Sequence, residues 1–188
     1  MKIVLASASP RRKEILHTAG IGFEVCVSNV EEVITQSEPG LVVEELSRQK
    51  AEDVAKKYPD DALIIGADTV VAVHGKILGK PKDREDAKAM LRELSGDVHQ
   101  VVTGVTLIRG EMKHSFHVVT DVTVCELTEE EMDSYVNSDE PMDKAGAYAI
   151  QGLFGKYITK IDGEYNNVVG LPVAALYAHC KTLGISVM

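Results

Sequence analysis

The stretch IVLASASPRRKEILHTAG, residues 3–20, decides the fold class, because it predicts a buried strand that leads directly into a helix. Residues 3–5 form the short apolar run that is typical of a buried strand. Ser9 suits the helix N-cap, and Pro10 suits the first helical position, where its missing N–H costs nothing. Apolar residues then recur at helical spacing, and we expect the helix to end near Gly20.

Arg11, Arg12 and Lys13 lie side by side at this helix start, although the chain carries a formal net charge of -9. Arg12 is three residues before Ile15 and therefore lies on the apolar stripe of the helix. The unpaired N–H groups of a helix start favour anions. Hydroxyls, two arginines and the helix N-terminus would together suit a phosphate. A solvated basic cluster explains this one segment equally well.

Length and composition predict one globular domain over residues 1–188. The chain has 45% hydrophobic and 26% charged residues, enough to bury a core. It has neither a membrane-length apolar run nor a signal-peptide pattern, and its three cysteines are scattered. We therefore expect a cytoplasmic protein without a membrane partner. An acidic balance without a basic tail argues against nucleic-acid binding.

The remaining pattern alternates between strand and helix signals. Apolar or alternating runs predict strands at 22–34, 61–73, 99–109, 115–127 and 156–170, and a turn at His74 and Gly75 leads into residues 76–81. Periodic apolar residues and capping signals predict helices at 40–58, 83–95, from 128 and from 172, the last with Val173, Leu176, Tyr177 and Cys180 on one face. This mixture predicts an α/β fold in which helices flank a mixed, twisted sheet.

Two charged residues occupy positions where packing favours apolar ones. Asp68 lies inside the apolar run 63–73, and a carboxylate buried there needs a cation, a metal ion or a set of N–H donors. Turn N–H groups after Gly66 would satisfy it as well. Lys50 continues the apolar stripe of its predicted helix, so its ammonium group points either toward the same interior or along the surface to solvent.

A metal site is the second hypothesis that these residues support. Glu31 and Glu32 come at the end of the predicted strand 22–34, where only one of the two can face a given site. That carboxylate and Asp68 would supply two oxygen ligands, enough for a Mg²⁺ ion that keeps its waters and binds substrate phosphates. A charged strand end is also explained by plain solvation.

The histidines do not suggest a competing zinc site. His114 and His117 are three residues apart in a predicted strand, so their side chains point to opposite faces of the sheet. A zinc ion needs several ligands that converge on one point. Lys80, in a loop between a glycine and a proline, carries no ligand signal by itself.

Taken together, the motifs resemble those of the Maf family of nucleotide pyrophosphatases. The most specific matches are LASASPRRKEIL at 5–16, IGADTVV at 65–71 and EPMDKAGAYAIQG at 140–152, and shorter matches extend to VVGLP at 168–172. The resemblance implies an α/β enzyme with two lobes around a cleft, a homodimer in the cytoplasm. It also implies a divalent cation, Mg²⁺ or Mn²⁺, and cleavage of a nucleoside triphosphate into monophosphate and pyrophosphate.

The resemblance also implies roles for individual residues. Asp68 matches the catalytic base, and Glu32 lies beside the metal together with Asp68. The residues that match the phosphate site are Ser7, Arg11, Arg12, Lys50 and Lys80.

Three positions match the branch of the family that acts on dTTP and UTP: Arg11, Thr69 and Gln151. The branch that acts on 7-methyl-GTP typically has tryptophan in place of Arg11. A glutamine amide offers the donor and the acceptor that a uracil or thymine edge requires, although it could equally cap a loop. A house-cleaning pyrophosphatase is the main interpretation. The alternatives are a 7-methyl-GTP pyrophosphatase and a nucleotide-binding regulator of septum formation with little turnover.

Overall fold

The computed structural model describes residues 1–138 and 140–187. Its chain divides into two units, each assembled from separate stretches of sequence. The first comprises Met1–Asp68, Thr103–Val118 and Gly170–Met188, and the second comprises Thr69–Val102 and Val119–Val169. Three long strands contribute residues to both units: β3 (Leu63–Val73), β5 (Val98–Arg109) and β6 (Met112–Val124).

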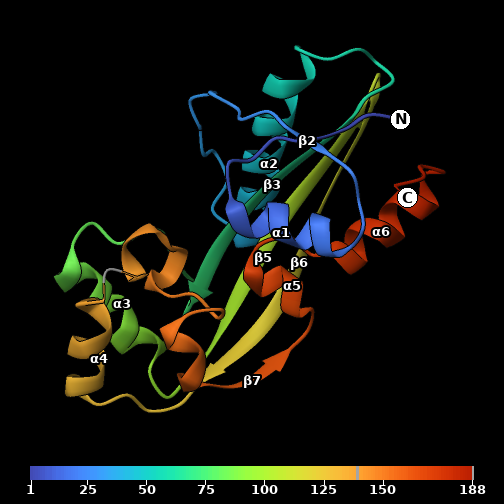
Figure 1. Ribbon diagram of the computed structural model, residues 1–188. Coiled ribbons are helices and arrows are strands. Elements are labelled where there is room, and N and C mark those ends of the chain that lie inside the picture. The colour runs from blue at the N-terminus through green and yellow to red at the C-terminus, as the bar shows by residue number, and fades with distance from the viewer. Residues whose placement is uncertain (139, 188) are drawn as a thin grey trace. The chain divides into compact units, whose positions relative to one another are not determined.

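The strands form one mixed sheet, which confirms the predicted fold class. Its order is β2-β1-β3-β5-β6-β7, and β4 also pairs with β3 (Figure 1). β1 runs parallel to β2 and β3, whereas β4 is antiparallel to β3 and β7 is antiparallel to β6. The short strands are β1 (Ile3–Leu5), β2 (Glu24–Val25), β4 (Lys76–Leu78) and β7 (Ile158–Asp162).

All five predicted helices are present. They are α1 (Pro10–Thr18), α2 (Pro39–Ala55), α3 (Arg84–Leu94), α4 (Glu129–Val136) and α6 (Val173–Thr182), and the structure adds α5 (Tyr165–Val169). The predicted capping box is present at the start of α4, where Thr128 and Glu131 each satisfy the other's backbone N–H. Within the described residues, none of the helices combines the length and the apolar character needed to cross a membrane.

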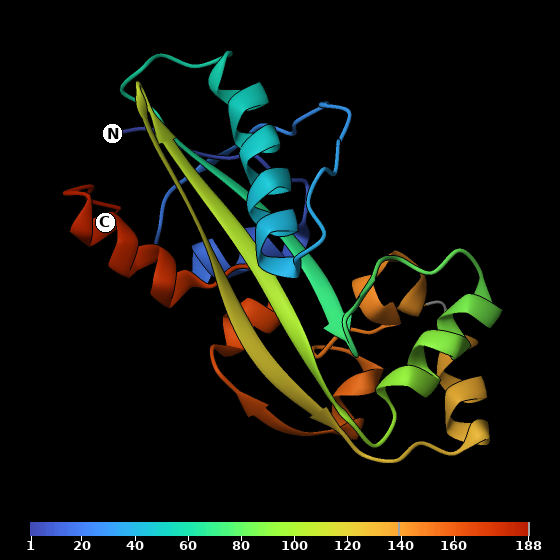
Figure 2. The same cartoon turned by 180° about the vertical axis from the view of Figure 1, so that it is seen from behind.

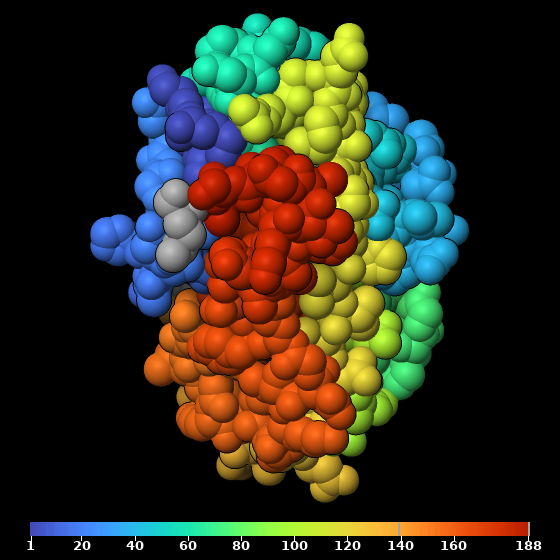
Figure 3. Space-filling model, turned by 90° about the vertical axis from the view of Figure 1, so that its right-hand side faces the viewer, coloured from blue at the N-terminus to red at the C-terminus, as the bar shows by residue number. Residues whose placement is uncertain are grey.

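In the first unit, α2 covers one face of the sheet and α1 and α6 cover the other (Figures 1 and 2). The two histidines of β6 mark these faces. His117 Nδ1 lies 2.6 Å from a carboxylate oxygen of Glu44 on α2, and His114 Nε2 lies 2.9 Å from His179 Nδ1 on α6. The predicted opposite orientation of His114 and His117 is therefore confirmed. Figure 3 shows the C-terminal residues, in red, lying beside the yellow residues of β5 and β6.

Two glycines allow the backbone of α2 to lie directly on the sheet. A Cβ atom on Gly66 of β3 would be 2.3 Å from the Ser47 carbonyl oxygen, and one on Gly104 of β5 would be 2.3 Å from the Val43 carbonyl oxygen. Real Cβ atoms do not approach this closely, so only glycine fits at either position. The contact at Gly66 fixes the turn of α2 that contains Lys50 beside β3.

The predicted strand over 22–34 is wrong for most of its length, because only Glu24 and Val25 pair in the sheet. Residues 26–37 have no regular secondary structure. The apolar residues that suggested a strand do not reach the core, since Val33 is 57% exposed and Ile34 is 59% exposed. Without a buried face, the segment gains nothing from joining the sheet. Glu31 and Glu32 therefore lie in a loop instead of at a strand end.

Two C-terminal predictions also need correction. The strand predicted over 156–170 ends at Asp162, and α5 follows after Gly163, whose φ of 132° breaks the strand. The buried face of α6 is narrower than predicted, because Leu176 and Cys180 are fully buried while Tyr177 is 50% exposed.

The core of the second unit contains a buried histidine. His99 of β5 is 1% exposed, and its Nε2 atom lies 2.6 Å from the hydroxyl of Tyr148. Among the described residues, its Nδ1 atom has no hydrogen-bond partner. Burial lowers the pKa of His99 to about 4, against a weaker opposing effect of the carboxylates of Asp97 and Asp121.

This burial predicts a pH-dependent stability. The imidazole takes up a proton near pH 6.5 in the unfolded chain and only near pH 4 in the folded chain. The contribution of the neutral His99 side chain to the stability of the fold is therefore complete above pH 6.5 and is lost as the pH falls toward 4. We expect His99 to cost about 2 kcal/mol of unfolding free energy between pH 7.5 and pH 5.

Urea unfolding of the wild type and of His99→Gln at these two pH values measures this cost. The variant should lose less stability on acidification by about that amount, since glutamine can still bond to Tyr148 without titrating. An equal loss in both proteins would show that His99 does not cause the pH dependence.

Candidate active site

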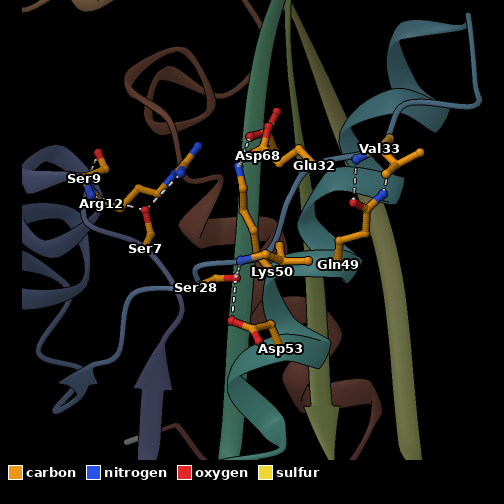
Figure 4. A network of polar contacts seen from close by, with 11 residues as sticks. Ser7, Ser9, Arg12, Ser28, Glu32, Val33, Gln49, Lys50, Asp53 and Asp68 are labelled. Carbon is orange, nitrogen blue, oxygen red and sulfur yellow. Dashed lines mark hydrogen bonds and ion pairs between the residues drawn. The ribbon is translucent and has the colours of Figure 1, made fainter.

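The ammonium group of Lys50 joins two carboxylates in the first unit. Lys50 Nζ lies 3.0 Å from Glu32 Oε1 and also donates a hydrogen bond to Asp68 Oδ1 (Figure 4). The side chains of Lys50 and Asp68 are only 18% and 16% exposed. Lys50 therefore points inward, which is the first of the two orientations that the sequence allowed. The alternative of turn N–H donors for Asp68 is also wrong, because Asp68 lies inside β3 and bonds to Lys50.

Glu32 and Asp68 supply carboxylate oxygens, the type of ligand that divalent cations such as Mg²⁺ prefer. Both carboxylates contact the same nitrogen atom, so their oxygens converge on one region. Mg²⁺ is commonly held by one or two carboxylates together with waters and substrate phosphates. Within residues 1–138 and 140–187, no cluster of three His, Cys, Asp or Glu side chains could enclose a metal ion. The two carboxylates could thus supply two ligands of such a cation, and the others would have to come from water or a bound molecule.

The start of α1 forms a second polar group in the same unit. Ser7 is 7% exposed, and its hydroxyl oxygen accepts hydrogen bonds from Arg12 Nη1 at 3.1 Å and from the Ser9 N–H at 3.2 Å. Arg12 Nε donates to the carbonyl oxygen of Gly170 at 2.8 Å. The Ser9 hydroxyl caps the helix as predicted, by accepting from the Arg12 N–H at 3.5 Å. These contacts fix the guanidinium group beside Ser7.

Arg12 and Asp68 are close enough for their charges to interact. Burial lowers the pKa of the Arg12 guanidinium, the negative charge of Asp68 opposes that shift, and the neighbouring charge of Arg11 adds to it. A guanidinium group is so strongly basic that Arg12 remains a cation at neutral pH despite this shift. The group at α1 and the group at Lys50 therefore belong to one electrostatic environment.

The other predicted site residues have different positions. Arg11 is partly buried on α1 in the first unit, and Thr69 is partly buried on β3 in the second unit. Lys80 and Gln151 are both exposed in loops of the second unit. Within that unit, the Gly146 N–H donates to the Gly79 carbonyl oxygen at 3.0 Å, which joins the loop of Lys80 to the segment that leads to Gln151. Their roles stay predictions, as does the cleft.

The sequence analysis missed two features of this site. One is the Gly170 carbonyl that holds Arg12, since a backbone acceptor leaves no signal in a sequence. The other is a row of polar residues on α2, Glu45, Gln49 and Asp53, that holds the loop of Glu32. Polar residues at this spacing usually mark the solvent face of a helix, so the pattern was not informative.

Comparison with known proteins identifies the family of this chain. The model of the Maf-like protein family matches residues 2–183. A dTTP/UTP pyrophosphatase of Lachnoclostridium phytofermentans is 53% identical over 192 residues, which cover 100% of this chain and 98% of the relative. A dTTP/UTP pyrophosphatase of Agathobacter rectalis is 54% identical, with 99% of each chain covered. Another, from Bacillus cereus strain G9842, is 50% identical, with 99% and 97% covered.

These matches extend over almost the whole length of both partners, and they include the segments that carry the site described above. The resemblance found in the sequence motifs is therefore confirmed, and the chain belongs to the Maf family.

Proposed function

We propose that this protein hydrolyses dTTP and UTP to the nucleoside monophosphate and pyrophosphate, and that it thereby removes unwanted nucleotides. The structural observation that carries the proposal is the pair of salt bridges from Lys50 to Asp68 and Glu32. The charge of Arg12 also interacts with that of Asp68. Cations for a polyphosphate and a carboxylate for a water molecule thus share one environment. The relatives, which are dTTP/UTP pyrophosphatases at about half identity, support the same substrates.

The reaction requires a water molecule to attack the α-phosphorus while the bond to the bridging oxygen breaks. Asp68 orients the water and takes up its proton as the new P–O bond forms. Pyrophosphate leaves with the bridging oxygen and its electron pair. Lys50, on a flexible four-carbon stem, turns from Asp68 toward the phosphates, and the charge that develops there is stabilised by positioned cations.

The other phosphate contacts come from the residues that match the family pattern. Ser7, Arg11 and Arg12 at the start of α1 hold phosphate oxygens, with the N–H groups of the helix start beside them. Lys80 adds a further cation. Glu32 and Asp68 would hold the divalent cation, Mg²⁺ or Mn²⁺, which when bound neutralises charge on the phosphate oxygens.

Nucleotide choice depends on Arg11, Thr69 and Gln151 in this proposal. The Gln151 amide donates to one atom and accepts from another on the base edge of uracil or thymine. We further propose a cytoplasmic homodimer. The cysteines Cys26, Cys125 and Cys180 are all free, in agreement with a reducing compartment.

Product analysis tests the proposed activity. Purified protein is incubated with Mg²⁺ and dTTP, UTP, CTP, dATP or 7-methyl-GTP, and the products are separated by chromatography. We expect dTMP or UMP and pyrophosphate in equal amounts, formed fastest from dTTP and UTP. Monophosphate and two phosphates per turnover would indicate a different bond and contradict the proposal.

Two other results would replace parts of the proposal. Fastest turnover of 7-methyl-GTP would retain the reaction and overturn the roles given to Arg11 and Gln151. Binding of dTTP without any hydrolysis would favour a nucleotide-binding regulator, since a binder has no use for a base at Asp68.

A further inference from the structure

None of the apolar side chains in the loop that carries Glu32 is fully buried. Residues 28–35 form no helix or strand, and the side chains of Val33 and Ile34 are more than half exposed. Glu32 itself is 47% exposed. Hydrophobic burial therefore does little to hold Glu32 in contact with Lys50, and other interactions must fix the path of this loop.

Three polar side chains of α2 supply these interactions, with two hydrogen bonds each. Asp53 Oδ2 accepts from the Ser28 hydroxyl at 2.9 Å and from the Asn29 N–H at 3.1 Å. Gln49 accepts from the Val33 N–H at 2.9 Å and donates to the Val33 carbonyl at 2.6 Å (Figure 4). Its amide thus pairs with both backbone groups of Val33.

The third side chain is Glu45, which is 8% exposed. Its two carboxylate oxygens accept from the Thr35 N–H at 2.8 Å and from the Thr35 hydroxyl at 2.6 Å. Bonds of this kind, to an ionised acceptor, are stronger than neutral ones. They also lower the pKa of Glu45, as the bonds from Ser28 and Asn29 lower that of Asp53. Both carboxylates therefore stay ionised at neutral pH.

The spacing of these contacts explains the position of Glu32. Glu45, Gln49 and Asp53 are four residues apart on one face of α2, about 6 Å from one to the next along the helix axis. The four-residue step from Asn29 to Val33 would span about 13 Å if extended, so residues 30–32 contain more chain than the helix step requires and must bend. The two-residue step from Val33 to Thr35, about 7 Å when extended, is taut.

We infer that Glu45, Gln49 and Asp53 are positioning residues, which hold the bent part of the loop so that the carboxylate of Glu32 lies opposite Asp68. The inference rests on the proposed function, because Glu32 and Asp68 are the cation ligands there. The three side chains bond to the loop and not to Glu32, Lys50 or Asp68. They act through the loop backbone, and their loss leaves Glu32 free to swing into solvent.

Mn²⁺ binding to the substrate-free protein, followed by electron paramagnetic resonance, tests the inference without relying on turnover. Gln49→Leu removes both bonds to Val33 with no change of charge, and we expect it to weaken Mn²⁺ binding about tenfold or more. Asp53→Ala and Asp53→Asn carry the same charge, but only asparagine can still accept from Ser28 and Asn29. We expect the alanine variant to lose affinity and the asparagine variant to retain it.

Glu52→Gln is the matched control on α2, because the Glu52 carboxylate bonds to Lys113 and not to the loop. It should bind Mn²⁺ like the wild type. Amide exchange should become faster at the N–H groups of Val33 and Thr35 in Gln49→Leu, with the melting temperature within about 3 °C of the wild type because few apolar contacts are lost. A general loss of protection would indicate a merely structural role and overturn the inference.

The remaining outcomes separate the inference from the proposed function. Faster exchange in the loop with unchanged Mn²⁺ affinity would overturn the positioning role alone. The positioning role alone would also be overturned if the wild type and Gln49→Leu needed the same concentration of divalent cation to release pyrophosphate from dTTP. Absence of both Mn²⁺ binding and hydrolysis in the wild type would overturn the proposed function, and the inference with it.

Discussion

Asp68→Asn should lower kcat for dTTP by about a hundredfold or more while the protein stays folded. Asparagine has nearly the same shape, and its amide oxygen can still accept from Lys50, which bonds to Asp68 in the wild type. The amide cannot take up a proton from an attacking water, so the loss falls on the chemical step. Pyrophosphate release at saturating Mg²⁺ and dTTP measures kcat, and circular dichroism checks the fold.

Asp61→Asn is the matched control for this substitution. Asp61 is exposed and comes just before β3. The Asp61→Asn variant therefore loses the same charge from the same part of the chain as Asp68→Asn. We expect its kcat to be unchanged. If Asp68→Asn retained kcat within about threefold of the wild type, Asp68 would not be the general base, since such a group contributes at least about a hundredfold.

Gly66→Ala should strongly destabilise the first unit. The new Cβ would lie 2.3 Å from the Ser47 carbonyl oxygen and 2.9 Å from the Cβ of Ala51. The nearest atom belongs to the backbone, so no rotamer change relieves the clash and α2 must move away from β3. We expect a cost of about 3 kcal/mol in unfolding free energy, measured by urea denaturation.

The kcat of Gly66→Ala for dTTP should fall together with its stability. Lys50 is on α2 and Asp68 is on β3, so a movement of α2 away from β3 separates the two side chains. A displacement of about 1 Å in a catalytic arrangement can cost about a hundredfold in rate. Gly22→Ala is the control, since no atom lies within 4 Å of a Cβ there and its φ is compatible with alanine. A Gly66→Ala protein with wild-type stability and kcat would contradict the role of this contact.

Local signals predicted the regular elements well. The helix start at Ser9 and Pro10, the capping box of Thr128 and Glu131, and the apolar run of β3 all depend on residues within a few positions of one another. The physical preferences that set these features act over the same short range. The sequence motifs also identified the family, because several matches at separate places in the chain coincide.

Elements whose stability depends on distant partners were predicted poorly. The segment at 22–34 alternates like a strand, yet Val33 and Ile34 find no core to enter. Backbone groups of Asn29, Val33 and Thr35 bond to side chains of α2 instead of to a neighbouring strand. Similarly, Tyr177 has the helical spacing of a buried residue of α6, but the neighbouring elements leave half of it exposed.

The sequence by itself determined the order of the elements, the family, and the requirement that Asp68 have a partner, since a carboxylate in an apolar strand is unstable alone. Only the tertiary structure decided that the partner is Lys50 and that Glu32 joins them. The reason is geometric. Lys50 reaches Asp68 because Gly66 admits the backbone of α2 onto β3, and Glu32 reaches Lys50 because side chains of α2 hold its loop. Contacts between residues so far apart in the chain depend on packing, which no local pattern encodes.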